Sequence, residues 1–475
     1  MTGSKRLALT VLSAATLMTI LDGSIVTVAL PAIQQDLGFT PAGLSWTVNA
    51  YLIAFGGLLL LAGRLGDLIG RKSLFLTGNA VFTIASLLAG AATTPAMLVA
   101  ARFLQGVGSA LASSVVLGIL VTLFTENGER ARAIGIFSFT GAAGASIGQV
   151  LGGVLTDAMN WHWIFLINVP IGALTIAFAI KSLPADRGIG LSAGADALGA
   201  LLVTGGLMLG IYTVVQIEQY GWTSARTLGL GAISSALLLG FVVRQRTART
   251  PLLQLRIFRS RSVSGANLAQ MLTLSAMFAF QILVALYMQR VLGYSALATG
   301  LAMLPAAVAI GGVSLFASAR LITRFGARTV LLAGLVLLLA GMGWLTRLPV
   351  EASYAVDLLP MMVLIAGGGL VLPALTTLGM ADAAPADAGL ASGLFSTTQQ
   401  VGMAIGIAVL STLAAARTGT ELVAGATEAA ALTSGYRLAF TVAAGLLAAA
   451  LVVGLLVLRR PAHTTSRQLA PAAAH

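Results

Sequence analysis

Long apolar runs separated by short charged turns are the feature that most limits how this chain can fold. A helix needs about 20 apolar residues to cross the hydrocarbon core of a bilayer, at about 1.5 Å per residue. Because 58% of the residues are hydrophobic and only 9% are charged, we predict an all-α polytopic membrane protein. Fourteen runs are long enough to span, at residues 7-30, 44-63, 73-92, 96-122, 133-156, 163-183, 196-217, 227-244, 263-288, 296-319, 328-346, 356-379, 390-414 and 435-458.

The positions of the basic residues support this count. If the N-terminus is cytoplasmic, 21 of the 27 Lys and Arg residues fall on the cytoplasmic side and 5 on the other, which fits the positive-inside rule. An even number of spans places both termini in the cytoplasm. The basic residues recur in separate loops, which suits the lipids of an anionic leaflet and argues against a nucleic acid partner.

Two cytoplasmic loops divide the chain, at residues 184–191 and in the Arg-rich segment 244–261. They bracket spans seven and eight, and the remaining spans form two sets of six, a recurrent plan among transporters. We therefore expect an N-terminal six-helix bundle at 1-184, two inserted helices with their linkers at 185-256, a C-terminal six-helix bundle at 257-460 and a flexible cytoplasmic tail at 461-475.

Asp22 is the only charged residue between Arg6 and Asp36, inside the first run. A charge within the bilayer is costly and usually faces the bundle interior or a wet cavity. By helical rise, Asp22 lies about 12 Å and Arg102 about 9 Å below the outer surface, and Gln105 shares a helix face with Arg102. We predict that Asp22 takes up and releases a proton with the help of Arg102 and Gln105. The alternatives are a permanent structural ion pair or a structural carboxylate near the outer interface.

Two glycine-rich patterns predict close helix contacts that can change. The turn after span two is predicted to be a cytoplasmic gate, because glycines allow helix ends to approach and the charges suit a helix terminus and the inner leaflet. The alternative is an ordinary tight basic turn. Its residues are Gly63, Asp67, Gly70, Arg71 and Lys72. In span five, glycines at four-residue spacing form a face on which another helix can pack, although such spacing alone usually means ordinary packing. These residues are Gly144, Gly148, Gly152 and the adjacent Gly153.

Together these motifs resemble those of the major facilitator superfamily (MFS), and in particular its fourteen-spanner drug:proton antiporters of the QacA and EmrB type. The resemblance rests on residues 21–31, 63–72, 102–106, 144–153 and 161–172. It implies the MFS fold with two extra helices, alternating access, and proton-coupled efflux of lipophilic compounds across the bacterial inner membrane. It also implies a monomer that is driven by the proton gradient, without a cofactor or metal. The chain departs from the family pattern at Thr27, Gln149 and His162, where Asn, Pro and Arg are usual.

The substrate class follows from charge. The resemblance implies that dication exporters of this type carry further acids in the membrane, whereas the second span here has only Asn49 and spans ten and thirteen have none. We therefore predict monocationic or neutral lipophilic substrates in an apolar and aromatic cavity. The candidate cavity residues are Trp46, Asn49, Tyr51, Phe278, Gln281, Phe395 and Gln399.

Other functions fit the sequence less well. A membrane enzyme would need clustered catalytic residues, but the chain has no Cys, and two of its three histidines, His463 and His475, lie in the tail. A dedicated exporter of one endogenous metabolite, antibiotic or lipid would share the fold and remains open, as does a solute importer, which the antiporter-like fifth span opposes.

Overall fold

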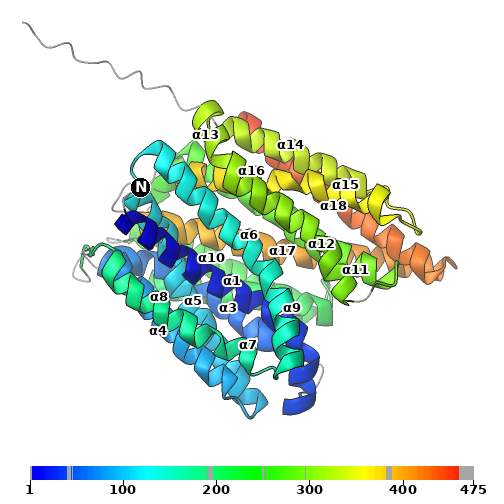
Figure 1. Cartoon of the computed structure of the whole chain (residues 1–475), viewed down its shortest axis with the longest axis horizontal. Helices are drawn as coiled ribbons and strands as arrows, with labels where there is room; N and C mark the ends of the chain where they lie inside the picture. Colours follow the sequence, from blue (N-terminus) through cyan, green and yellow to red (C-terminus); the bar gives the residue numbers. More distant parts are fainter. Residues whose placement is uncertain are drawn as a thin grey trace, which may run out of the picture.

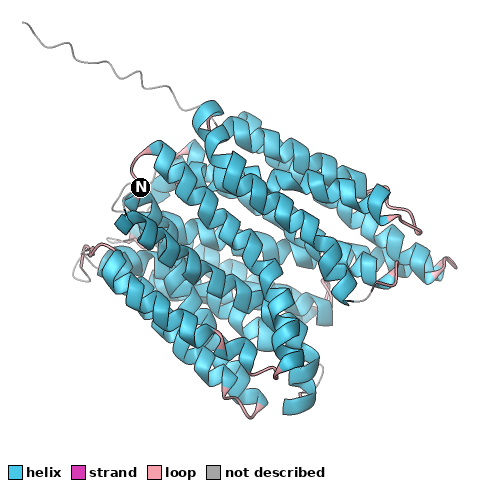
Figure 2. Ribbon diagram, in the orientation of Figure 1, coloured by secondary structure: helices cyan, strands magenta, loops and turns pink. Residues whose placement is uncertain are grey.

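The computed structural model describes residues 3–39, 44, 46–186, 188–190, 196–248, 251–253, 255–294, 296–380 and 388–458. Throughout these ranges the regular elements are helices, as Figure 2 shows. Thirteen of the described helices are long and apolar enough to cross a membrane. The remaining predicted span, 133-156, lies within α6 (Asn127–Ala158), whose 32 residues are enough for a fourteenth. The predicted all-α, multi-spanning fold is thus confirmed, whereas the predicted tail at 461-475 lies outside the described residues.

The N-terminal group of helices holds Asp22 in its interior. It comprises α1 (Gly3–Leu37), α3 (Trp46–Ile69), α4 (Arg71–Gly90), α5 (Pro95–Leu123), α6, α7 (Trp163–Leu166) and α8 (Asn168–Ser182). α1 packs along α6, α5 packs between α3 and α4, and α8 packs against α1 and α4 (Figure 1). α5 starts sharply because Thr94 caps it through the amide of Met97, and Pro95 occupies its first turn.

The C-terminal group contributes most of the largest buried apolar cluster of the described residues, which also includes Leu117, Val121 and Ala131 of α5 and α6. Two of its spans consist of several consecutive helical segments. One is α12 (Ala296–Gly312), η3 (Val313–Ser318) and α13 (Ala319–Phe325); the other is η4 (Tyr354–Leu358), α15 (Leu359–Leu364), η5 (Ile365–Gly367) and α16 (Gly368–Gly379). The other helices are α11 (Arg261–Arg290), α14 (Ala327–Leu345), α17 (Ala388–Val423) and α18 (Glu428–Leu456).

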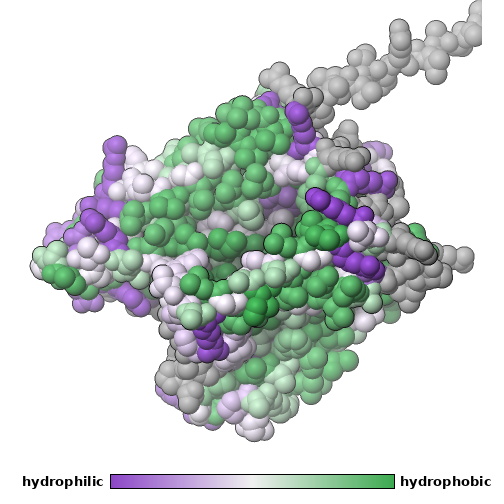
Figure 3. Space-filling view, turned by 180° about the vertical axis from the view of Figure 1, so that it is seen from behind, coloured by the Kyte–Doolittle hydropathy of each residue, from purple (hydrophilic) through white to green (hydrophobic). Residues whose placement is uncertain are grey.

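The two helices predicted to be inserted, α9 (Ala197–Tyr220) and α10 (Ala225–Thr247), pack against each other, and α9 also packs against α3. Gly57 of α3 makes this second contact possible, because a Cβ atom at that position would clash with the side chain of Met208. A short helix, η2 (Leu255–Arg259), leads from α10 to α11. In the space-filling view, hydrophobic side chains cover the middle of the visible face and hydrophilic ones gather toward its ends (Figure 3).

The two groups contact each other at the end of the molecule where α1 begins and α18 ends (Figure 1). There the Ser314 hydroxyl of η3 donates to the Gly135 carbonyl of α6, at 3.1 Å. Gly393 of α17 meets α3 so closely that a Cβ atom on it would lie 3.1 Å from the Gly63 Cα. Farther along α6, on the same helix face as Gly135, Val150 is 52% exposed. The groups therefore touch at the terminal end and separate toward the other.

Candidate functional site

The three residues predicted to act on the proton lie together in the interior of the N-terminal group. The Asp22 side chain of α1 is fully buried, and the Arg102 and Gln105 side chains of α5 are buried beside it. Arg102 Nη1 lies 2.5 Å from Asp22 Oδ2, and Gln105 Nε2 donates to Asp22 Oδ1 at 3.1 Å. Arg102 Nη1 also donates to Gln105 Oε1 at 2.8 Å, so the amide is held in one orientation.

Two further residues complete this site, and we call the five residues together the Asp22 cluster. Asn168, the first residue of α8, donates from Nδ2 to Asp22 Oδ1 at 2.9 Å. Ser86 of α4 accepts from Gln105 Nε2 at 2.8 Å. Side chains of α5 and α8 thus bind the carboxylate of α1 directly, and α4 joins the site through Gln105.

Sequence reasoning missed Asn168, because it is uncharged, although the depth count that linked Asp22 to Arg102 places it at a similar depth. Asn168 lies five residues beyond the start of α7 at Trp163, about 8 Å deep by the same helical rise.

The other side of Arg102 is fixed by α3. Arg102 Nε donates to the Thr47 carbonyl at 2.9 Å, and its guanidinium carbon lies 4.5 Å from the centroid of the Tyr51 ring. The Tyr51 hydroxyl in turn donates to Ser109 Oγ at 3.1 Å. Tyr51, a predicted cavity residue, is therefore buried against the ion pair, where its ring face favours a cation.

The Asp22 cluster is electrically balanced and closed to solvent. The carboxylate accepts hydrogen bonds from Arg102, Gln105 and Asn168, which is the satisfied arrangement that a buried charge requires. A proton added to Asp22 would leave the guanidinium without its counter-charge. Protonation of Asp22 would therefore leave one unpaired positive charge, that of Arg102, buried inside the helix bundle.

The glycines of α6 pack against the turns of α1 that flank Asp22. A Cβ atom on Gly144 would meet the side chains of Leu17 and Ile20, and one on Gly148 would clash with Ser24 Oγ and lie 2.9 Å from the Leu21 carbonyl. One turn further on, a Cβ atom on Gly152 would lie 2.8 Å from the carbonyl of Ile25, and Gly153 beside it is half-buried. α1 and α6 therefore touch through backbone on both sides of Asp22.

The same construction recurs in the C-terminal group. A Cβ atom on Gly402 of α17 would lie 2.7 Å from the Met271 carbonyl of α11, and Gly406 meets Ser275 in the same way one turn later. Both helix pairs can approach closely because small residues line one side.

The predicted gate turn between α3 and α4 is bound to the segment that follows α8. Asp67 Oδ1 accepts from Arg71 Nη2 at 2.9 Å within the turn, which Gly70 allows with a φ of 98°. The Asp186 carboxylate accepts from the backbone amides of Arg71 and Lys72, at 2.7 and 3.0 Å. Asp186 thus caps the start of α4 from a distant part of the chain.

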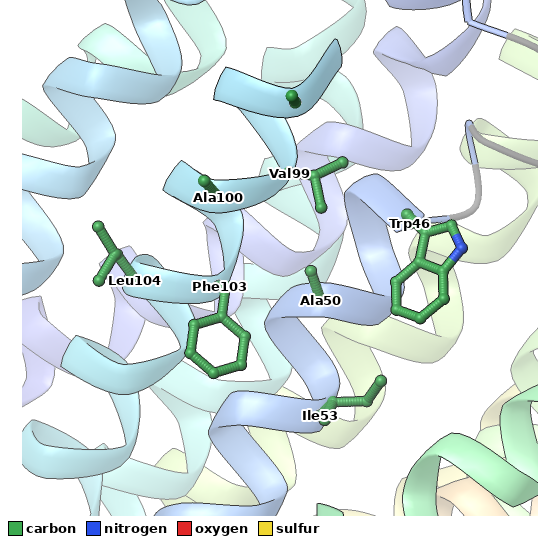
Figure 4. Close-up of a pocket in the computed structure, with 8 residues that line it drawn as sticks. Trp46, Ala50, Ile53, Val99, Ala100, Phe103 and Leu104 are labelled. Carbon is green, nitrogen blue, oxygen red and sulfur yellow. The ribbon is translucent and has the colours of Figure 1, made fainter.

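The predicted cavity residues differ in their burial and surroundings. Trp46 lines an apolar pocket of about 650 Å³ between α3 and α5, together with residues such as Ile53, Val99 and Phe103 (Figure 4). Phe278 is exposed, Phe395 is buried against Gly379, and three other candidates are half-buried: Asn49, Gln281 and Gln399.

Comparison with known proteins assigns the family. The model of the Major Facilitator Superfamily matches residues 12–407, most of the chain. The chain belongs to this superfamily. It is accordingly a transporter and not an enzyme, and the match includes every residue of the Asp22 cluster.

Among similar superfamily members is the puromycin resistance protein of Streptomyces alboniger, which is 37% identical over 95% of this chain and 89% of its own length. The cephamycin export protein of Amycolatopsis lactamdurans is 39% identical over 87% of this chain and 85% of its own. The human organic anion transporter MFSD10 (TETRAN) shares the fold, with a TM-score of 0.66, 15% identity, and coverage of 95% of this chain and 99% of the other.

Proposed function

We propose that this superfamily member is a proton-coupled exporter that moves lipophilic, neutral or monocationic compounds out of the bacterial cytoplasm by alternating access. The observation that carries the proton coupling is the buried Asp22 carboxylate, held by Arg102, Gln105 and Asn168. The export of antibiotics or other toxic compounds is supported by relatives named for resistance and export. In this proposal a monomer works in the inner membrane, and the proton gradient supplies the energy without a cofactor.

The contacts between the two helix groups suggest which state of the cycle the structure represents. We place both termini in the cytoplasm, as the basic loops predict. The contacts of Gly135 with Ser314 and of Gly63 with Gly393 then close the cytoplasmic side, while the outer halves stand apart. In this outward-facing state Asp22 receives a proton from outside, the ion pair loosens, and α1 shifts along the glycine face of α6.

The substrate class follows from the balance of charge. Among the acids that the structure describes, Asp22, Asp67 and Asp196 are buried, and only Asp22 lies deep within a span. Asp22 is a single carboxylate, which can balance at most one positive charge on a substrate if its pairing with Arg102 loosens, so a second positive charge would find no partner there. We therefore assign neutral and monocationic amphipaths, whose apolar parts suit walls such as those around Trp46 and Phe103.

Efflux from intact cells tests this proposal. Ethidium export under an imposed proton gradient should be lost in Asp22→Asn, which keeps the shape of the side chain but cannot take up a proton. The matched control is Asp36→Asn, the same change near the outer end of the same helix, where Trp161 Nε1 donates to the carboxylate. Export that survives in Asp22→Asn at normal expression would contradict coupling at Asp22.

A second candidate is a dedicated exporter of one antibiotic, favoured by relatives named for puromycin and cephamycin. A susceptibility panel distinguishes the two candidates. Protection against several unrelated lipophilic compounds supports the multidrug exporter, and protection against one compound class supports the dedicated exporter.

A further inference from the structure

Asn168 differs from the other groups that hold Asp22, because its amide has an unused oxygen. Its Oδ1 atom is buried and has no hydrogen-bond partner, while its Nδ2 atom donates to Asp22. A buried acceptor left empty beside a charged site is unusual, since most such atoms are paired. We propose that Asn168 is a positioning residue that serves both protonation states of Asp22, as a donor to the carboxylate and as an acceptor from the carboxylic acid. This inference rests on the proposed proton coupling.

The hydrogen bonds around Asp22 show why an acceptor is needed. Asp22 Oδ2 is taken by Arg102, and Asp22 Oδ1 accepts from both Gln105 and Asn168. A carboxylic acid carries one O–H group, which must find an acceptor when it is buried. If the proton goes to Oδ1, one of the two donors to that atom must give way.

Asn168 is the donor that can give up its hydrogen bond and then accept one from the acid. Arg102 has no acceptor atom, and Gln105 Oε1 already accepts from Arg102 Nη1. Asn168 can turn its amide by about 180° about the last side-chain torsion, which is broad for asparagine, and then present Oδ1 instead of Nδ2. The Asp22 O–H group would then donate to Asn168 Oδ1, while Gln105 continues to donate to the acid.

The step balances without any further reactant. A proton from the outer aqueous phase forms a bond to Asp22 Oδ1, Arg102 keeps its own protons, and the charge of the cluster rises by one. On release to the cytoplasm the O–H bond breaks, the carboxylate returns, and the amide turns back. The charged or titratable groups that face this step in the described residues are Arg102 of α5 and Tyr51 of α3, whereas α4, α6 and α8 contribute neutral groups there.

Infrared difference spectroscopy on the full-length protein in lipid vesicles tests the inference without a substrate. The sample carries asparagine labelled with ¹³C in the side-chain carbonyl, and spectra at low and high pH are subtracted. We expect the acid form to show a new carboxylic-acid band that is absent in Asp22→Asn. We also expect a labelled amide carbonyl band to move to lower frequency, because the carbonyl gains a hydrogen bond, and this band should be absent in both Asn168→Leu and Asp22→Asn.

The controls separate the two proposals. Asn79→Leu removes an equally buried amide that donates to the Phe75 carbonyl, and it should leave the labelled band in place. A carboxyl band that appears while the labelled amide band does not move would overturn the role of Asn168 and leave proton coupling intact. If no Asp22 carboxyl band appears over the pH range in which the protein stays folded, the proposed coupling fails and this inference fails with it. In gradient-driven export, Asn168→Leu should be about tenfold slower than the unaltered protein, since an unpaired buried hydroxyl is costly.

Discussion

Removing Arg102 should destabilise the protein at neutral pH and much less in acid. In Arg102→Gln the Asp22 carboxylate stays buried between Gln105 and Asn168 but loses its cation. Breaking a buried pair by deleting one partner costs about 3–5 kcal/mol. The carboxylate can escape this cost by taking up a proton, whereas in Asp22→Asn the arginine cannot lose one. The two single variants should therefore respond differently to pH.

The magnitude follows from the titration of an ordinary carboxyl. Because an aspartic acid in water titrates near pH 3.9, keeping one protonated costs about 4 kcal/mol at pH 7 and about 1.5 kcal/mol at pH 5. Proton uptake thus limits the loss of unfolding free energy in Arg102→Gln to about 4 kcal/mol at neutral pH. At about pH 5 this loss is smaller by about 2.7 kcal/mol. The stability of this variant, relative to the unaltered protein, rises as the pH falls.

Thermal unfolding in detergent micelles measures the effect. We expect Arg102→Gln to lower Tm at pH about 7 and to recover most of it at pH about 5, and Asp22→Asn to lower Tm at both. The double variant should be more stable than the sum of the single changes predicts, because it buries no charge. Arg226→Gln, at an exposed arginine over the Tyr220 ring, is the matched control and should change little. Additive effects of the two single changes, or an Arg102→Gln variant that is insensitive to pH, would refute this reasoning.

Three other predictions concern the contacts around the site. Gly148→Ala should abolish most export at normal expression, because its Cβ would lie 2.9 Å from the Leu21 carbonyl and force α6 away from α1; unchanged efflux would show that this contact is dispensable. Asp186→Ala should cost about 1 kcal/mol, seen as a lower Tm, because the first amides of α4 lose their cap, whereas Asp186→Asn should cost less. Burial raises the pKa of the Asp196 carboxyl. Its hydrogen bonds, the first of them from the Gly199 amide, lower the pKa by more than burial raises it, so the pKa lies below its ordinary value. The ionised Asp196 therefore stabilises the folded protein at pH values above the ordinary pKa of aspartate. This stabilisation is lost as the pH falls through the lower pKa of the folded state. Asp196→Asn should therefore make Tm depend less on pH in the acid range.

The sequence predicted the multi-spanning helical fold because bilayer thickness fixes the length of each apolar run. The sequence also predicted that Asp22 and Arg102 lie close together, because helical rise converts residue number into depth and opposite charges at similar depth attract. Asn168 and Tyr51 lie at the same depth, but they are uncharged, and an uncharged residue in a span usually means packing. The predicted cavity residues stay a prediction, because the lining of a cavity depends on which halves of the helices separate, and rise along one helix says nothing about that.

The capping of α4 by Asp186 has a consequence for protein engineering and for evolution. This carboxylate lies in the segment that leads to the inserted helices, and the same segment bonds to the end of α3, where the Ile189 amide donates to the Asp67 carbonyl. A shortened twelve-helix version made by excising the chain between α8 and α11 would delete these contacts along with α9 and α10. Such a minimised transporter would need a new cap for α4, so the inserted pair cannot be regarded as a detachable module.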